Sequence, residues 1–166
     1  DLSSLQPQKV TMKLPKYVAT IDPVVVTAKR AASLDKVGFT QRQKSGQGFY
    51  LGPDQIQSIH PQQLTDILTR VPSLRITYGP NGNDVTSSRG TNSLNGGGQC
   101  VQFYVDDMPW QSATPGDVNN FLNANEVVGV EVYAGPGVPA QYSRGMQDCT
   151  TIVVWTKFKI RDLPTK

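Results

Sequence analysis

Two runs rich in β-branched residues near the end of the chain most constrain its fold. Residues 125–136 read NEVVGVEVYAGP, and residues 150–157 read TTIVVWTK. The first run fits a short helical turn followed by a strand, which the pair Gly135 and Pro136 brings to an end. The second run has no polar alternation, which is typical of a buried strand. We therefore expect two strands in the closing part of the chain.

Composition favours a single domain built from short elements. The chain has 166 residues, with 15 glycines, 12 prolines and only 17% charged residues. That mixture is typical of many turns and short strands rather than long helices, and periodicity by itself predicts only an α+β class. Basic residues are scattered along a chain of net charge +3, so we expect no nucleic-acid partner.

Local signals place several short elements before the closing strands. Pro53 is expected to start a short helix, and a second helix is expected to run from Pro61 to Pro72 with one apolar stripe. Residues 37–43 alternate and predict a strand, followed by a flexible loop at residues 44–48. Residues 117–121 are expected to form a brief helix.

Several segments, taken in order, resemble the plug domain of TonB-dependent outer-membrane receptors. Residues 64–76 (LTDILTRVPSLRI) are similar to the plug's DLLRRVPGVSV, and residues 87–90 (SSRG) to its SIRG. Residues 101–110 (VQFYVDDMPW) resemble VLVDGVPL, with Asp107 at the usual Gly. The two closing runs resemble the plug's IEVLKGP and INIVTK. The resemblance covers about residues 34–157.

The resemblance implies a plug-like fold, a small mixed β-sheet with a few short helices. We expect an extended N-terminal arm at residues 1–33, the plug-like domain at 34–157 and a tail at 158–166. The chain has no room for the eight or so strands of a barrel and no run of about 18 apolar residues, so we expect a stand-alone plug without a transmembrane segment. It begins with Asp1, which fits removal of a signal peptide and a periplasmic location.

The arm carries the β-branched run Val24, Val25 and Val26. An exposed run of this kind suits strand addition to the edge of a partner's sheet. It is also similar to the TonB box, the short segment by which such receptors recruit TonB. The alternative is that the run is simply the first strand of this domain.

Cys100 and Cys149 each stand immediately before a predicted strand. If those strands are neighbours, the two side chains lie within bridging distance, and we expect a disulfide. Such a bond fits an oxidising compartment such as the periplasm. The alternative is a pair of ordinary free thiols.

The histidine, the paired aspartates and the glycine run of this chain do not follow the patterns of catalytic or ligand-binding sites. His60 is the only histidine, and its place before Pro61 predicts a helix-entry role rather than catalysis or metal ligation. Asp106 and Asp107 fit a hairpin turn better than an acid–base pair. A glycine run at residues 96–98 lacks the Lys and Ser or Thr of a phosphate loop. We therefore expect no catalytic residues, no metal site and no cofactor.

Trp110, which follows the predicted turn, is the candidate exposed anchor for a partner, whereas Trp155 is expected in the core. Arg89, Arg144 and Glu131 are expected to pair within the domain; the alternative is that Arg89 is a second partner-facing candidate.

These observations lead to two functional hypotheses. The first is a non-enzymatic periplasmic interaction or structural module that docks through its arm and loops onto another protein, such as the periplasmic face of a respiratory or photosynthetic membrane complex. The second is the plug component of a split TonB-dependent uptake receptor, which binds a ligand and TonB.

Overall fold

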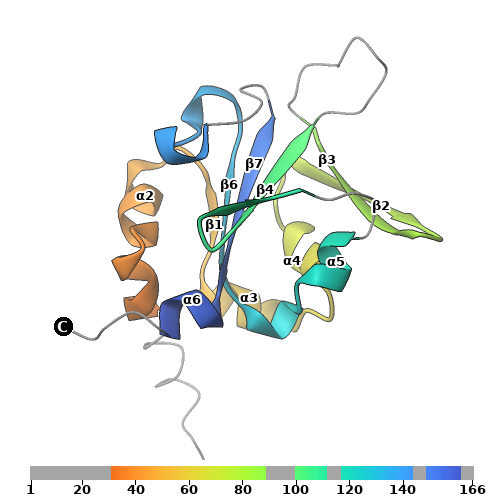
Figure 1. The fold of residues 1–166 in the computed structure, drawn as a ribbon, viewed down its shortest axis with the longest axis horizontal. Helices are drawn as coiled ribbons and strands as arrows, with labels where there is room; N and C mark the ends of the chain where they lie inside the picture. Colours follow the sequence, from red (N-terminus) through yellow and green to blue (C-terminus); the bar gives the residue numbers. More distant parts are fainter. Residues whose placement is uncertain (1–30, 89–99, 112–116, 144–148, 162–166) are drawn as a thin grey trace, which may run out of the picture.

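The computed structural model describes residues 31–88, 100–111, 117–143 and 149–161 (Figure 1). Val24, Val25, Val26, Arg89 and the 96–98 loop therefore lie outside the described residues.

A mixed five-stranded sheet forms the centre of the molecule, with strand order β1-β6-β7-β4-β5. The strands are β1 (Phe49–Leu51), β4 (Val101–Val105), β5 (Met108–Trp110), β6 (Val127–Tyr133) and β7 (Thr150–Thr156). β4 runs parallel to β7, and the other neighbouring pairs are antiparallel. This sheet confirms the predicted plug-like α+β fold.

The two predicted closing strands are the central ones, β6 and β7. Every residue of both strands is buried. Their apolar side chains alternate between two separate core clusters, as period-2 strands covered on both faces require. Runs such as Ile152–Val153–Val154 therefore lack polar alternation because neither face meets water.

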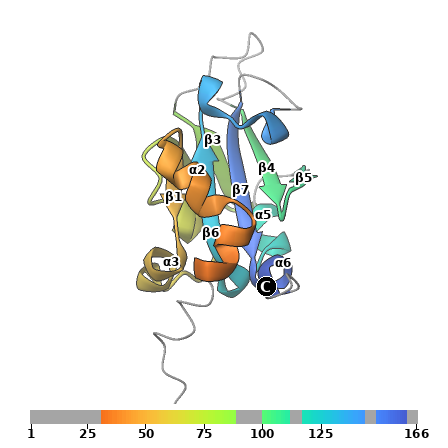
Figure 2. The same cartoon turned by 90° about the vertical axis from the view of Figure 1, so that its left-hand side faces the viewer.

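Short helices cover both faces of this sheet. They are α2 (Phe39–Ser45), α3 (Pro53–Ile59), α4 (Leu64–Leu68), α5 (Asp117–Phe121) and α6 (Lys157–Arg161). Buried residues of α3, α4 and α5 join one core cluster, and those of α2 and α6 join the other. Figure 2 shows α2 lying across β6. The described residues also include the 3-10 turns η1 (Ala124–Glu126), η2 (Gly135–Gly137) and η3 (Ala140–Tyr142).

A second, two-stranded sheet stands beside the first. It is a hairpin of β2 (Leu74–Gly79) and β3 (Gly82–Ser87), which turns between Gly79 and Gly82. Asn83 ties it to α4 through a hydrogen bond from Nδ2 to Thr65 Oγ1 of 2.9 Å.

The strand predicted at residues 37–43 is wrong, because this stretch enters α2. Gly38 adopts a left-handed backbone with φ 77°, and Gly46 ends the helix with φ 71°. Phe39 and Arg42, three residues apart, then share one helix face toward the sheet. That packing outweighs the weak local alternation.

Two helix boundaries also differ from the sequence expectation. The second helix begins at Leu64 rather than at Pro61, because Asp66 caps it by accepting hydrogen bonds from the backbone N–H groups of Gln62 and Gln63. His60 follows the end of α3 with φ 51°, so it marks a helix exit and not a helix entry.

The predicted Asp–Asp turn joins β4 to β5. Asp106 and Asp107 have φ 53° and 72°, the left-handed values that a two-residue hairpin loop of type I′ requires. Asp106 also accepts hydrogen bonds from the backbone N–H and hydroxyl of Thr156, at 2.8 and 2.6 Å. The turn therefore ties the end of β7 to β4.

The predicted disulfide between Cys100 and Cys149 is present, with a Cα–Cα distance of 4.8 Å. It follows from the strand pairing, since β4 and β7 are parallel neighbours with Val101 opposite Thr150. Each cysteine thus precedes one of two aligned residues.

We predict that reducing this disulfide lowers the free energy of unfolding by about 4 kcal/mol, because a bond spanning 49 residues restricts the unfolded chain. Urea denaturation with and without reductant measures the change. A chain carrying both Cys100→Ser and Cys149→Ser should not respond to reductant. Equal midpoints for the oxidised and reduced wild-type protein would contradict the prediction.

Candidate functional site

The most polar buried site centres on Glu131 in β6, whose side chain has no exposed surface. Its carboxylate accepts two hydrogen bonds from Arg42, Nε at 2.9 Å and Nη2 at 2.7 Å. Trp155 Nε1 donates a third at 2.5 Å, and the hydroxyl of Tyr133 donates a fourth. Four donors therefore converge on this buried carboxylate. We call Arg42, Glu131, Tyr133 and Trp155 the buried ion-pair cluster.

Arg42 reaches the buried ion-pair cluster from helix α2, whereas Glu131 belongs to strand β6. Its Nη1 also donates to the carbonyl oxygen of Val37 at 2.9 Å. Its guanidinium lies 5.8 Å from the ring centroids of both Tyr142 and Trp155, within cation–π range. Burial alone would lower the pKa of Arg42, but the hydrogen bond and charge of Glu131 raise it above its ordinary value.

Two further tyrosines, Tyr50 and Tyr142, lie beside the cluster tyrosine Tyr133 and Arg42. The Tyr50 hydroxyl donates to the Tyr133 hydroxyl at 3.1 Å, and the Tyr142 hydroxyl donates to Asp107 at 2.8 Å. Burial raises the pKa of all three tyrosines above the ordinary value. They are therefore neutral hydrogen-bond donors at physiological pH.

The buried ion-pair cluster holds α2 against the sheet, and its groups are engaged with one another. Within the described parts of the chain, no buried side-chain nitrogen or oxygen lacks a hydrogen-bond partner. The carboxylate of Glu131 has no exposed surface from which to meet a substrate. The cluster joins α2 to β6 across 89 residues of sequence.

Glu131 thus pairs within the domain, as one of the sequence alternatives held, and its partner is Arg42. Arg89 and Arg144 lie outside the described residues. Sequence reasoning missed Arg42, because it fell in the stretch predicted to be a strand.

A group of exposed apolar side chains lies where β5 and α5 meet. Trp110 is half-buried between Phe103, with ring centroids 5.8 Å apart, and Phe121, on which it stacks at 5.1 Å. Phe121 is 59% exposed and Met108 is 71% exposed. We call Met108, Trp110 and Phe121 the aromatic shelf. Trp110 was the sequence candidate for an anchor, and its two more exposed neighbours were missed.

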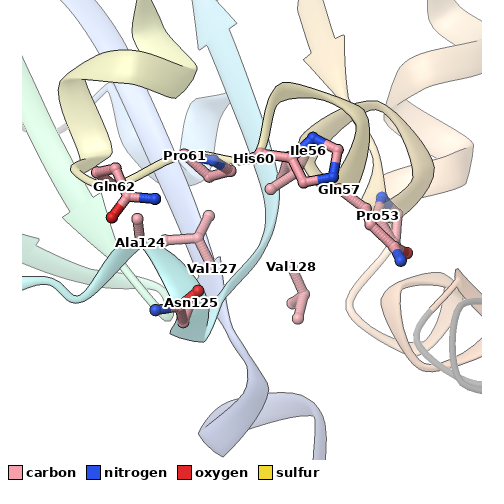
Figure 3. A pocket seen from close by; sticks show the side chains of 10 residues that line it. All are labelled: Pro53, Ile56, Gln57, His60, Pro61, Gln62, Ala124, Asn125, Val127 and Val128. Atoms are coloured by element: carbon pink, nitrogen blue, oxygen red, sulfur yellow. The ribbon is translucent and has the colours of Figure 1, made fainter.

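A pocket of about 360 Å³ lies between α3 and the start of β6 (Figure 3). Its lining carries amides, prolines, aliphatic side chains and one imidazole: Pro53, Ile56, Gln57, His60, Pro61, Gln62, Ala124, Asn125, Val127 and Val128. It contains no carboxylate to work with His60, whose Nδ1 lies 3.2 Å from the carbonyl oxygen of Ser58. The pocket therefore lacks an acid–base pair.

In the described residues, no group of three or more His, Cys, Asp or Glu side chains is placed to hold a metal ion. Asp106 accepts hydrogen bonds from Thr156, and Asp107 accepts one from the Tyr142 hydroxyl. None of the helices in the described ranges is long and apolar enough to span a membrane.

The family model of the TonB-dependent receptor plug domain matches residues 41–146, well over half of the chain. The mixed sheet and its covering helices agree with that match. The protein therefore belongs to the TonB-dependent receptor plug domain family. No curated protein matches this chain.

Solved receptor structures share the fold. A mutant form of the ferric enterobactin receptor of Pseudomonas aeruginosa superposes with TM-score 0.52 and 20% identity over 70% of this chain. The siderophore receptor PirA of Acinetobacter baumannii gives 0.50 and 18% over 67%. This chain spans only 18% and 17% of the length of those receptors. At such identities the likeness establishes the fold alone.

We predict that Glu131→Gln lowers the free energy of unfolding by about 3 kcal/mol, because it leaves the partly buried guanidinium of Arg42 without its counter-charge. Urea denaturation followed by tryptophan fluorescence measures the loss. Asp84→Asn, at an exposed carboxylate of β3, is the control and should change stability by less than about 0.5 kcal/mol. Equal effects of the two substitutions would contradict the role of the cluster.

The raised tyrosine pKa values predict loss of stability in alkali. The unfolded chain releases tyrosine protons near pH 10, whereas folded Tyr50, Tyr133 and Tyr142 retain theirs. Their contribution is therefore fully present below about pH 10 and is lost as the pH rises through the raised values. As the pH is raised, tyrosinate absorbance should show a step above pH 10 that coincides with loss of the near-UV circular dichroism signal. Ionisation of every tyrosine near pH 10 with the fold intact would contradict this expectation.

Proposed function

We propose that this protein is a non-catalytic plug module that docks onto another protein in the periplasm. The observation that carries the proposal is the aromatic shelf, which presents apolar side chains to solvent on a rigid, internally satisfied domain. Aromatic side chains and methionine are enriched at protein interfaces, where a few such anchors dominate the binding energy.

The framework beneath the shelf supports this function. Trp110 packs on Phe103 of the core, so the shelf is anchored to β4. β4 is itself joined to β7 by the disulfide and by the Asp106 contacts. A preorganised surface loses little conformational entropy on binding.

The arm and the loops are the second element of the proposal. Val24–Val26 suit strand addition to a partner's sheet edge, and Arg89 suits an acidic partner surface. The disulfide fits a periplasmic location. The proposed host is a membrane protein complex with a periplasmic face.

Isolation from native membranes in mild detergent tests the docking function. We expect the protein to co-migrate with a larger complex on native electrophoresis. Combined Phe121→Ala and Met108→Ala should release it, whereas Tyr78→Ala should not, although Tyr78 is 66% exposed on the β2–β3 hairpin. A free monomer in the soluble fraction at every salt concentration would defeat the proposal.

Family membership favours a second candidate, the plug of a TonB-dependent uptake receptor. In that case Val24–Val26 act as the segment that recruits TonB. The C-terminal domain of TonB should then capture the protein, and Val25→Pro should abolish capture, because proline removes a backbone donor needed for strand pairing. Failure to bind at high micromolar concentration would count against this candidate, with no bearing on the aromatic shelf.

A further inference from the structure

The pocket between α3 and the start of β6 meets the sheet at the edge of a strand. Val127 belongs to one core cluster and Val128 to the other, so their side chains lie on opposite faces of β6. A pocket lined by both residues therefore lies at the strand's edge rather than over a face (Figure 3). β7 pairs with the other edge of β6, and β1 ends at Leu51, opposite Val130. The pocket thus lies just beyond the end of β1.

Buried apolar side chains form the floor of this pocket. These lining residues are each at most 5% exposed: Ile56, Ala124, Val127 and Val128. The described residues that line the pocket include no Asp, Glu, Lys or Arg. A charged group placed there would lose water without gaining a counter-charge, so the pocket favours an uncharged ligand.

The rim of the pocket carries three exposed side-chain amides, those of Gln57, Gln62 and Asn125. Within the described ranges, no hydrogen bond engages any of these three amides. The amide of Gln63, by contrast, accepts a hydrogen bond from Asn83 at 3.0 Å. A side-chain amide has a donor and an acceptor in one plane, as a peptide group has. The three rim amides therefore suit the backbone of a bound peptide.

His60 adds one more polar group to the rim. Its Nδ1 lies 3.2 Å from the carbonyl oxygen of Ser58. A carbonyl oxygen only accepts hydrogen bonds, so Nδ1 carries the proton, and Nε2 of the neutral ring is an acceptor. Nε2 can thus accept a hydrogen bond from a backbone N–H group.

We propose that this pocket binds an extended, uncharged peptide segment of a partner protein, with one aliphatic side chain inserted onto the floor. The rim amides and His60 Nε2 then pair with the peptide groups on either side of that side chain. The volume of about 360 Å³ is at the lower end of the range for ligand pockets, which fits a short segment. The aromatic shelf includes β5, at the opposite edge of the sheet from β1, so this site is separate from it.

A nuclear magnetic resonance titration of the full, isotopically labelled chain tests this proposal. The probe is the uncharged blocked peptide acetyl-Ser-Thr-Leu-Thr-Ser-amide. We expect saturable shifts of the backbone resonances of Val127 and Val128 and of the side-chain resonances of the rim amides. The same peptide with Lys in place of Leu, or with a methyl group on the Leu nitrogen, should bind about tenfold more weakly. The first change removes the apolar contact, and the second removes a backbone donor.

Removing two rim amides should weaken probe binding. Combined Gln57→Ala and Asn125→Ala should weaken it about 30-fold, which corresponds to about 1 kcal/mol for each of two hydrogen bonds. The matched control, Gln41→Ala with Gln43→Ala, removes two exposed amides of α2 and should leave binding unchanged. Dispersion of the amide resonances confirms that each variant is folded.

Three results would overturn the proposal: no saturable shift at the pocket, equal binding of the methylated and parent probes, or equal weakening by the control pair. The measurement uses no partner protein and leaves Met108 and Phe121 intact. Its outcome is therefore independent of docking through the aromatic shelf.

Discussion

The ion pair between Arg42 and Glu131 is the interaction on which the rest of this structure depends. Glu131 lies on β6, an interior strand of the sheet, with no exposed surface, where an unpaired carboxylate would cost several kcal/mol. Its charge is tolerable only because Arg42, Trp155 and Tyr133 all direct donors at it. If helix α2 moved away from the sheet, Glu131 would lose its ion-pair partner Arg42. The pair therefore fixes where the helix packs.

The parallel strands β4 and β7 are linked to each other at both of their ends. The disulfide joins the residues that precede β4 and β7, and Asp106 binds Thr156 where the two strands end. Between these ties the strands are covered on both faces. These ties hold the sheet together, and the aromatic shelf packs on it through Trp110 and Phe103.

Local signals were enough to predict much of this frame. The closing strands, the start of α3, the helix at residues 117–121 and the Asp106–Asp107 turn each depend on residues close together in sequence. The disulfide also followed, because its cysteines flank strand-like runs. The resemblance of several ordered segments then indicated the plug fold, which periodicity alone did not.

What could not be predicted depends on distant contacts. α2 forms because Phe39 and Arg42 pack against the sheet. Arg42 and Glu131 are 89 residues apart in sequence, so no local pattern predicts the helix or the ion pair. The aromatic shelf likewise needs β5 and α5 to be adjacent before Met108 and Phe121 join Trp110.

A double-mutant cycle between Arg42 and Glu131 tests the central claim most directly. Free energies of unfolding are measured for the wild type, Arg42→Met, Glu131→Gln and the double variant. If the pair holds α2 on the sheet, the double variant should lose about 2 kcal/mol less unfolding free energy than the two single variants lose in sum. Additive losses, with a coupling energy below about 0.5 kcal/mol, would contradict that role.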